Sequence, residues 1–360
     1  MGQDIDITRK IIALLALRTA TGVSQALIDS LSSARSETEL FKKLDLTAEL
    51  QYLKESYLNS EVRLFAAGDI KRWEGSGISL LAVGSPDYPE LLAKIYNPPA
   101  LLFCRGEIPA KRFPLAIVGS RAADPQGARF ASTLAAELAS SGACIISGLA
   151  LGIDGMAHRG ALSGSQQGAT VAVLGSGLNE VYPRRHLKLA GEILASGGAL
   201  ISQFEPDTPP YPSNFLDRNR VIAGLSRAVI VVQAKKRSGA LVTARYALEE
   251  GRDVLAVPGS PGNPLSAGTN KLIKSGAYLV SSAEDVCELF EQLSSNKETA
   301  GRAGCSDPVC RLLAESGEMH IDELSRRLGL QDNLHLKLLE LELAGSIERR
   351  PGNLVALKTY

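Results

Sequence analysis

One short stretch of the chain brings together an aromatic ring, two guanidinium groups and a side-chain amide, at Phe215, Arg218, Asn219 and Arg220. Prolines crowd the ten residues before it, which indicates a stiff loop that delivers this stretch to a fixed place. An aromatic ring can stack on a base, and arginine can bind a phosphate through two hydrogen bonds. The pattern therefore favours an anionic ligand with a flat ring. The alternative is an ordinary helix start with Phe215 in the core.

The charge of the same region points the same way. Residues 214–246 hold seven basic side chains against Asp217 alone, whereas the whole chain has 39 basic and 39 acidic residues. A local excess of positive charge in an otherwise balanced chain favours a phosphate ligand, although basic loop residues can also be simply solvated.

Short apolar runs predict the elements that position these residues. Five of them, beginning at Leu115, Cys144, Val171, Ala228 and Asp253, are apolar throughout, as in strands of a parallel sheet buried on both faces, and a weaker one begins at Ala199. A small-residue turn and a helical pattern follow most of them. The first turn is Gly119-Ser120-Arg121, and Asp124 and Pro125 are typical of the helix start after it. Ligands of such α/β sheets bind at the carboxyl edge, where these turns gather.

Several catalytic and cofactor sites find no support. His158 has no second His or Cys at ligand spacing, so we expect no metal. Ser147, His158 and Asp154 lack a G-x-S-x-G elbow, so we expect no hydrolase triad. The turn after Val118 is not G-x-G-x-x-G, and there is no phosphate-binding G-x-x-x-x-G-K-[ST] loop. We therefore expect no cofactor. The five scattered cysteines indicate neither a zinc site nor a disulfide framework.

The sequence predicts three domains. Residues 1–77 are helical around Thr21-Gly22-Val23, which is typical of a SAM-like or helix-hairpin-helix domain or of a plain packing module. Residues 78–293 form the α/β domain, and 294–306 a linker. Residues 307–360 give three helices and a hairpin, a winged helix. Its nine acidic and seven basic residues argue against a DNA groove reader held by phosphates and favour partner contact or regulation.

Acidic Asp4 and Asp6 stand where a signal peptide would be basic, and no apolar run is long enough to cross a membrane. We expect a cytoplasmic protein.

Six segments in this order resemble one family, DNA-processing protein A (DprA, also called Smf): 116–121 (AIVGSR), 147–154 (SGLALGID), 172–175 (AVLG), 218–226 (RNRVIAGLS), 243–245 (TAR) and 257–260 (VPGS). The resemblance implies an extended Rossmann-like fold, with mostly parallel strands, that binds single-stranded DNA without catalysing a reaction. It also implies that the protein loads the RecA recombinase in natural transformation, and that it is a homodimer through the Rossmann-like domain.

The resemblance also implies roles for particular residues. Gly119, Ser120 and Arg121 would form the phosphate pocket, and its facing wall would be Phe215, Arg218, Asn219 and Arg220. Charge adds Arg184, Lys271 and Lys274. The family usually has Glu where this chain has Gln203 and Gln233. From these positions we expect loss of Arg121 or Arg218 to weaken DNA binding and to leave the thermal midpoint nearly unchanged.

Two rival functions are a nucleotide hydrolase of the lysine-decarboxylase-like (LOG) type and a nucleotide-binding sensor. When the hydrolase loop is aligned on Thr243, Tyr246 stands at the position of the catalytic Glu. The hydrolase would therefore lack its carboxylate. The sensor would hold a small nucleotide in the same pocket.

Overall fold

The protein is described by a computed structural model, which covers residues 60–83, 85–110, 112–164, 168–290, 293, 307–329, 334–343 and 347–357. It divides into two compact units, one up to Phe290 and one from Glu291. Each is described by itself.

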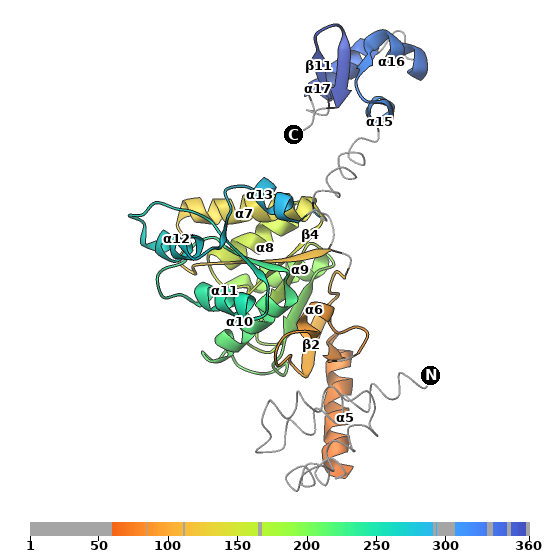
Figure 1. The fold of residues 1–360 in the computed structure, drawn as a ribbon. Helices are drawn as coiled ribbons and strands as arrows, with labels where there is room; N and C mark the ends of the chain where they lie inside the picture. Colours follow the sequence, from red (N-terminus) through yellow and green to blue (C-terminus); the bar gives the residue numbers. More distant parts are fainter. Residues whose placement is uncertain are drawn as a thin grey trace. The chain divides into compact units, whose positions relative to one another are not determined.

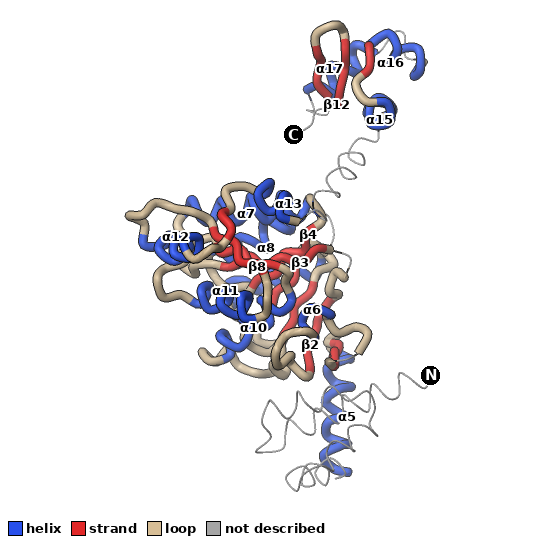
Figure 2. Tube along the Cα trace, in the orientation of Figure 1, coloured by secondary structure: helices blue, strands red, loops and turns tan. Residues whose placement is uncertain are grey.

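A nine-stranded sheet organises the described part of the first unit (Figures 1 and 2). Its order is β1-β2-β6-β5-β4-β3-β7-β8-β9, in which β1 and β2 are antiparallel to their neighbours and the other pairs are parallel. The strands are β1 Ser79–Ala82, β2 Leu101–Gly106, β3 Phe113–Val118, β4 Ala143–Ser147, β5 Thr170–Val173, β6 Ala199–Ser202, β7 Ala228–Val231, β8 Asp253–Ala256 and β9 Tyr278–Leu279.

All six strands predicted from apolar runs are confirmed, and so is the mostly parallel α/β fold. The segment expected only to lead into the sheet instead adds two antiparallel strands, β1 and β2. In β2, Leu102 packs with one core cluster while Leu101 and Phe103 pack with the cluster on the other face. The strand is therefore buried on both sides.

Helices cover both faces of the sheet. On one face α7 (Pro125–Ser140) packs on α8 (Ile153–Gly164), and α10 (Asn214–Leu225) packs on α11 (Gly239–Glu249) on the other. Among the described residues, the remaining helices of this unit are α5 Ser60–Gly75, α6 Glu90–Ala93, η1 Arg184–His186, α9 Leu187–Ala195, η2 Pro264–Ser266, α12 Ala267–Lys274 and α13 Ala283–Leu289.

The predicted start of α7 is confirmed. Asp124 precedes the helix and its carboxylate accepts the Gly127 N–H over 2.8 Å, while Pro125 is the first helical residue. This cap ends the turn that follows β3.

The strand order decides where a ligand can enter. From β3 the chain builds the sheet outward through β4, β5 and β6, and then returns to place β7 on the other side of β3. The connections after β3 and β7 therefore diverge at the carboxyl edge, which leaves a crevice at the point where ligands of such sheets bind.

Most of the predicted N-terminal helical domain lies outside the described residues. Its last helix, α5, packs on the sheet through Ile70 and Trp73, and the Trp73 ring meets Phe103 edge-on at 5.2 Å between centroids. A domain boundary at residue 77 remains a prediction.

The second unit has the predicted winged-helix elements, including a hairpin of two strands. They are α15 Pro308–Ser316, β10 Met319–His320, α16 Ile321–Leu328, α17 Leu334–Leu343, β11 Ile347–Arg350 and β12 Leu354–Leu357, with strand order β10-β12-β11. Cys310 is disulfide-bonded, a single bond that the spacing of the cysteines does not indicate. The predicted linker, 294–306, lies outside the described residues.

Within the described residues, no helix has the length and apolar character that a membrane crossing needs.

Candidate nucleic-acid interface

The turn after β3 places an arginine at the carboxyl edge of the sheet. A Cβ atom on Gly119 would lie 2.6 Å from Cγ1 of Ile153, so a residue with a side chain does not fit this close approach to α8. The Ser120 N–H donates to the Gln233 carbonyl over 2.7 Å. Arg121 itself is exposed. The backbone of the turn is thus fixed while the guanidinium remains accessible, as the sequence predicts.

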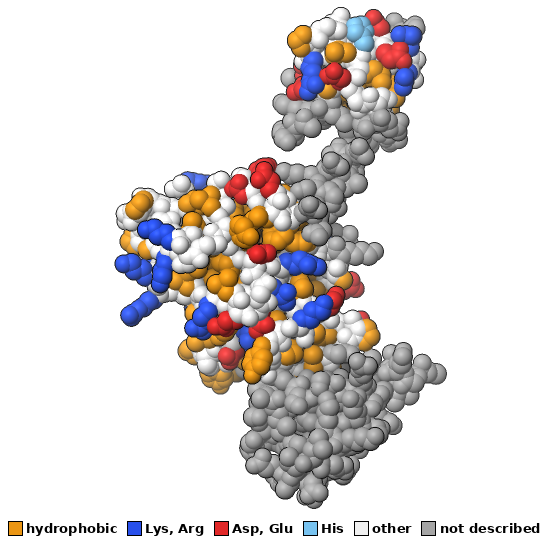
Figure 3. Space-filling model, viewed as in Figure 1, with side chains coloured by type: hydrophobic (Ala, Val, Ile, Leu, Met, Phe, Trp, Pro, Cys, Tyr) orange, Lys and Arg blue, Asp and Glu red, His pale blue; other side chains and the backbone are white. Residues whose placement is uncertain are grey.

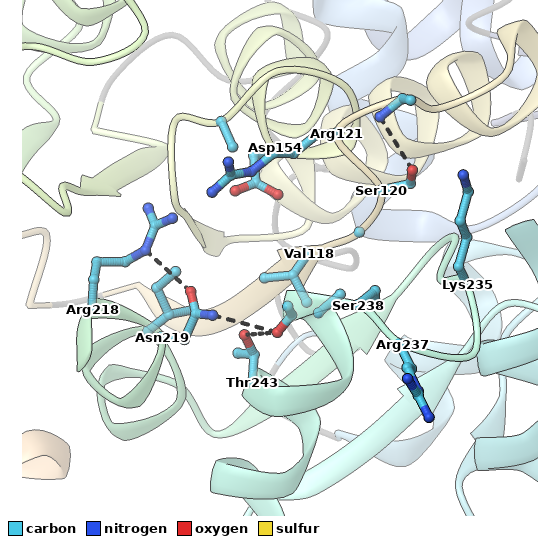
Figure 4. Close-up of a pocket in the computed structure, with 16 residues that line it drawn as sticks. Val118, Ser120, Arg121, Asp154, Arg218, Asn219, Lys235, Arg237, Ser238 and Thr243 are labelled. Carbon is cyan, nitrogen blue, oxygen red and sulfur yellow. Dashed lines mark hydrogen bonds between the residues drawn. The ribbon is translucent and has the colours of Figure 1, made fainter. Parts of the chain in front are cut away.

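A pocket of about 330 Å³ opens between this turn and the start of α11 (Figure 4). Lys235 and Arg237 line it from the loop after β7, and Ser238 and Gly239 line it from the first residues of α11. Free N–H groups and the positive end of the helix dipole favour an anion at such a place, and the cations add to this preference. The pocket therefore fits a phosphate group.

A second pocket, of about 490 Å³, shares part of its wall with the first. Arg121, Asn219 and Gly239 line both. The rest of its lining is mostly apolar, with Tyr182, Pro210, Pro212, Phe215 and Leu216. An apolar pocket beside an anion pocket can take the two parts of a nucleotide, a base and its phosphate.

Phe215 lines the second pocket and is surrounded by one aromatic and two cationic side chains. Its ring lies 5.7 Å from that of Tyr182, and the guanidinium carbons of Arg121 and Arg218 lie 5.0 and 5.8 Å from its centroid. A Cβ atom on Gly175 would lie 2.7 Å from the Phe215 ring, so a residue with a side chain at position 175 would collide with the ring. Phe215 is half-buried and lines the pocket, which favours the ligand-binding interpretation over the core interpretation.

Arg218 differs from the expectation of a free side chain. It is 3% exposed, and its Nη1 donates to the carbonyl of Gly148 and, over 2.7 Å, to that of Val173. Burial lowers the pKa of Arg218 to about 10, while the neighbouring Asp154 carboxylate opposes that change. The guanidinium holds the carboxyl ends of β4 and β5 together because their carbonyl groups need donors. The burial and the two hydrogen bonds of Arg218 therefore favour a loss of stability on its removal, in place of the unchanged thermal midpoint first expected.

Two histidines hold the turn after β4. Leu149 has a φ of 55°, a left-handed conformation that costs energy for a residue other than glycine. Its N–H donates to His158 Nε2 over 3.3 Å, and its carbonyl is 2.8 Å from His186 Nδ1. The Thr170 hydroxyl donates to a backbone carbonyl, so it accepts from His158 Nδ1–H over 2.7 Å. His158 is a fully partnered structural residue.

This arrangement makes stability sensitive to acid. Burial lowers the pKa of His158 to about 3, with smaller contributions from the positive charges of His186 and Arg218. Because the folded-state pKa lies below the unfolded value, the contribution is complete above about pH 6.5 and is lost as the pH falls toward 3. We expect a loss of about 2 kcal/mol between pH 6.5 and pH 5, measured by urea unfolding.

The variant His158→Gln isolates this effect, since glutamine does not titrate. Burial raises the pKa of Asp154, which acts in the opposite direction but is common to both proteins. A wild-type protein and variant with the same pH dependence of unfolding free energy would show that His158 is not the source.

Six of the ten predicted site residues line the two pockets: Gly119, Ser120, Arg121, Phe215, Arg218 and Asn219. The other four do not appear in the described linings. Arg184 is exposed in η1, Arg220 is half-buried in α10, and Lys271 and Lys274 are exposed in the last turn of α12. Lys and Arg side chains gather at the end of the unit that carries α12 (Figure 3). Their contact with a ligand remains a prediction.

Further lining residues were absent from the predicted set, namely Tyr182, Lys235, Arg237, Ser238 and Thr243. The basic excess in residues 214–246 was a signal for Lys235 and Arg237, and the small-residue turn was a signal for Ser238, while Thr243 begins the family segment 243–245. Tyr182 and Pro183 form a pair that also resembles the family, which was the signal for Tyr182.

Comparison with known families settles the relationship. Residues 79–291 match the model of the DNA recombination-mediator protein A family, and residues 295–353 match the DprA winged helix domain. The chain belongs to the DNA recombination-mediator protein A family. Protein Smf of Escherichia coli K12 is 44% identical over 291 residues, which cover 78% of this chain and 77% of that protein. DNA processing protein DprA of Bacillus subtilis is 44% identical over 60% of this chain and 72% of its own length.

Two solved structures of the family show the same fold. The X-ray structure of DNA processing protein A from Streptococcus pneumoniae has a TM-score of 0.63 at 34% identity, covering 74% of this chain and 98% of that one. DNA processing protein A from Helicobacter pylori has a TM-score of 0.53 at 30% identity, covering 60% and 96%.

Proposed function

We propose that this protein binds single-stranded DNA, with phosphates at the Gly119–Arg121 turn and α11, and bases against Tyr182 and Phe215. The observation that carries the proposal is the shared wall of the two pockets, because Arg121 can bind a phosphate while its guanidinium lies over the Phe215 ring. The Helicobacter pylori relative is described as having a single-stranded DNA binding mode, which supports the same ligand here.

We infer that the protein binds without catalysing a reaction. The aligned position of the hydrolase glutamate is Tyr246, which packs against the hydrophobic core and is absent from the described linings. Asp154 is the one carboxylate in those linings, and it accepts the Gly148 N–H and lies beside buried Arg218. Neither residue offers a free acid or base to a nucleotide.

We further propose that the protein acts in the cytoplasm during natural transformation, where it protects incoming DNA and loads the RecA recombinase. It would do so as a homodimer through the Rossmann-like domain. The last strand of the sheet supports a homodimer, because β9 is an edge strand whose Tyr278 and Leu279 are 48% and 50% exposed. Exposed apolar side chains on an unpaired edge favour association.

Binding to a labelled thymine oligomer tests the DNA proposal. We expect single strands to bind more tightly than duplex of the same length, since stacking on Tyr182 and Phe215 needs unpaired bases. If ~4 phosphates are neutralised per protomer, log Kd should change with log salt with a slope of magnitude near ~3. Equal affinity for duplex, or no salt dependence, would contradict the proposal. Tight binding of mononucleotides with weak binding of oligomers would favour the sensor.

Removal of the winged helix gives a second test. Five cations of this unit are in ion pairs with its own acids, namely Arg326, Arg327, Lys337, Arg349 and Arg350. We expect deletion of 305–360 to leave affinity for the thymine oligomer within about threefold, because paired cations release few counterions. A loss of tenfold or more, about 1.4 kcal/mol, would show that the winged helix binds the strand.

A further inference from the structure

One glutamine, Gln233, forms hydrogen bonds with both ends of the phosphate-binding turn. Gln233 follows β7 and is 7% exposed. Its backbone carbonyl accepts the Ser120 N–H over 2.7 Å, and its side-chain Oε1 accepts the Asp124 N–H over 3.2 Å. The residue thus fixes the first and last parts of the segment that carries Arg121, without lining either pocket.

The far end of the turn depends on a carboxylate that the Gln233 amide faces. Asp124 accepts the Gly127 N–H over 2.8 Å and the Asn263 side-chain amide over 3.1 Å. The Gly127 N–H, and next the Gln233 side chain, hold the pKa of Asp124 below its ordinary value. The carboxylate is therefore charged at neutral pH.

The space for the side chain at 233 is also closely bounded. A Cβ atom on Gly127 would lie 2.3 Å from Gln233 Cδ, so the amide is wedged against the first turn of α7. A side chain of the same shape but with a negative charge would fit the space while facing the Asp124 carboxylate. Two carboxylates that face each other repel, and a carboxylate has no hydrogen to donate to the other.

We propose that Gln233 is a positioning residue for DNA binding, whose neutral amide holds the Ser120–Asp124 segment so that Arg121 faces the pocket. This inference rests on the proposed function, which assigns phosphate binding to the turn. The inference requires that one of the two facing side chains, Asp124, is an acid and that the other, Gln233, is a neutral amide.

The test exchanges charge without changing shape. Gln233→Glu is expected to weaken binding of the thymine oligomer about tenfold. Adding Asp124→Asn to Gln233→Glu restores a donor–acceptor pair between the two side chains at the loss of the bond from the Asn263 amide, and should return affinity to within about threefold of wild type. Gln203→Glu is the matched control: it adds the same charge at the end of β6, which β5 and β4 separate from β3, and should leave affinity unchanged.

Hydrogen exchange of the segment 119–124 in the DNA-free protein provides a readout that does not require DNA binding. We expect faster exchange in Gln233→Glu and wild-type exchange in the double variant. Wild-type affinity and exchange in Gln233→Glu, or a double variant no better than the single one, would overturn the inference. If wild-type protein binds no DNA, the proposed function fails, while the exchange result still decides whether the amide holds the turn.

Discussion

Arg121→Ala is expected to weaken binding of a thymine oligomer by roughly 10- to 100-fold and to leave the thermal midpoint nearly unchanged. Arg121 is exposed, lines both pockets, and has its guanidinium carbon 5.0 Å from the Phe215 ring centroid. Loss of a charge-assisted hydrogen bond to phosphate costs about 1.5–3 kcal/mol, which gives the expected range of affinity. Because the turn is held through its backbone, removal of this side chain leaves the fold intact.

Electrophoretic shift beside a melting curve measures both quantities. Arg159→Ala is the matched control, since it removes an exposed arginine from α8 that does not appear in the described pocket linings. Arg121→Lys retains the charge but not the planar fork, and should recover only part of the affinity. Wild-type affinity in Arg121→Ala would show that the turn is not part of the DNA-binding site.

Arg218→Ala is expected to lower the free energy of unfolding by about 3–5 kcal/mol, and to weaken DNA binding as a consequence. The substitution removes the donors that satisfy the carbonyls of Gly148 and Val173. It also removes the positive charge that contributes most to offsetting the burial of the Asp154 carboxyl. Loss of one member of a buried charged pair has a cost of this size.

Urea unfolding of two further variants separates this cost from a general effect of losing an arginine. Arg220→Ala removes the half-buried neighbour on α10 and should change stability by less than about 1 kcal/mol. Adding Asp154→Asn to Arg218→Ala should recover at least ~1 kcal/mol, because the two residues interact. An Arg218→Ala protein of wild-type stability that has lost DNA binding would restore the direct phosphate role first expected of it.

The sequence was sufficient where local pattern determines structure. Short runs that are apolar throughout, such as Leu115–Val118, are typical of inner strands of a parallel sheet, which are buried on both faces. Asp124 before Pro125 specifies a helix start through a side-chain acceptor and a fixed φ. The winged-helix elements followed from helical spacing and a hairpin turn in the same way. No alternation reveals β1, because that strand has only four residues.

Tertiary structure alone decided which basic residues face a ligand. Arg121 and Arg218 have the same chemistry and both lie near predicted turns. Arg121 is exposed, whereas Arg218 is only 3% exposed because it packs against the ends of two strands. The difference arises because β4 and β5, adjacent in the sheet, bring the carbonyls of Gly148 and Val173 together where Arg218 reaches them. Likewise, the return of β7 to the side of β3 brings Gln233 against the turn at Ser120. Such contacts join residues far apart in the chain, so no local pattern encodes them.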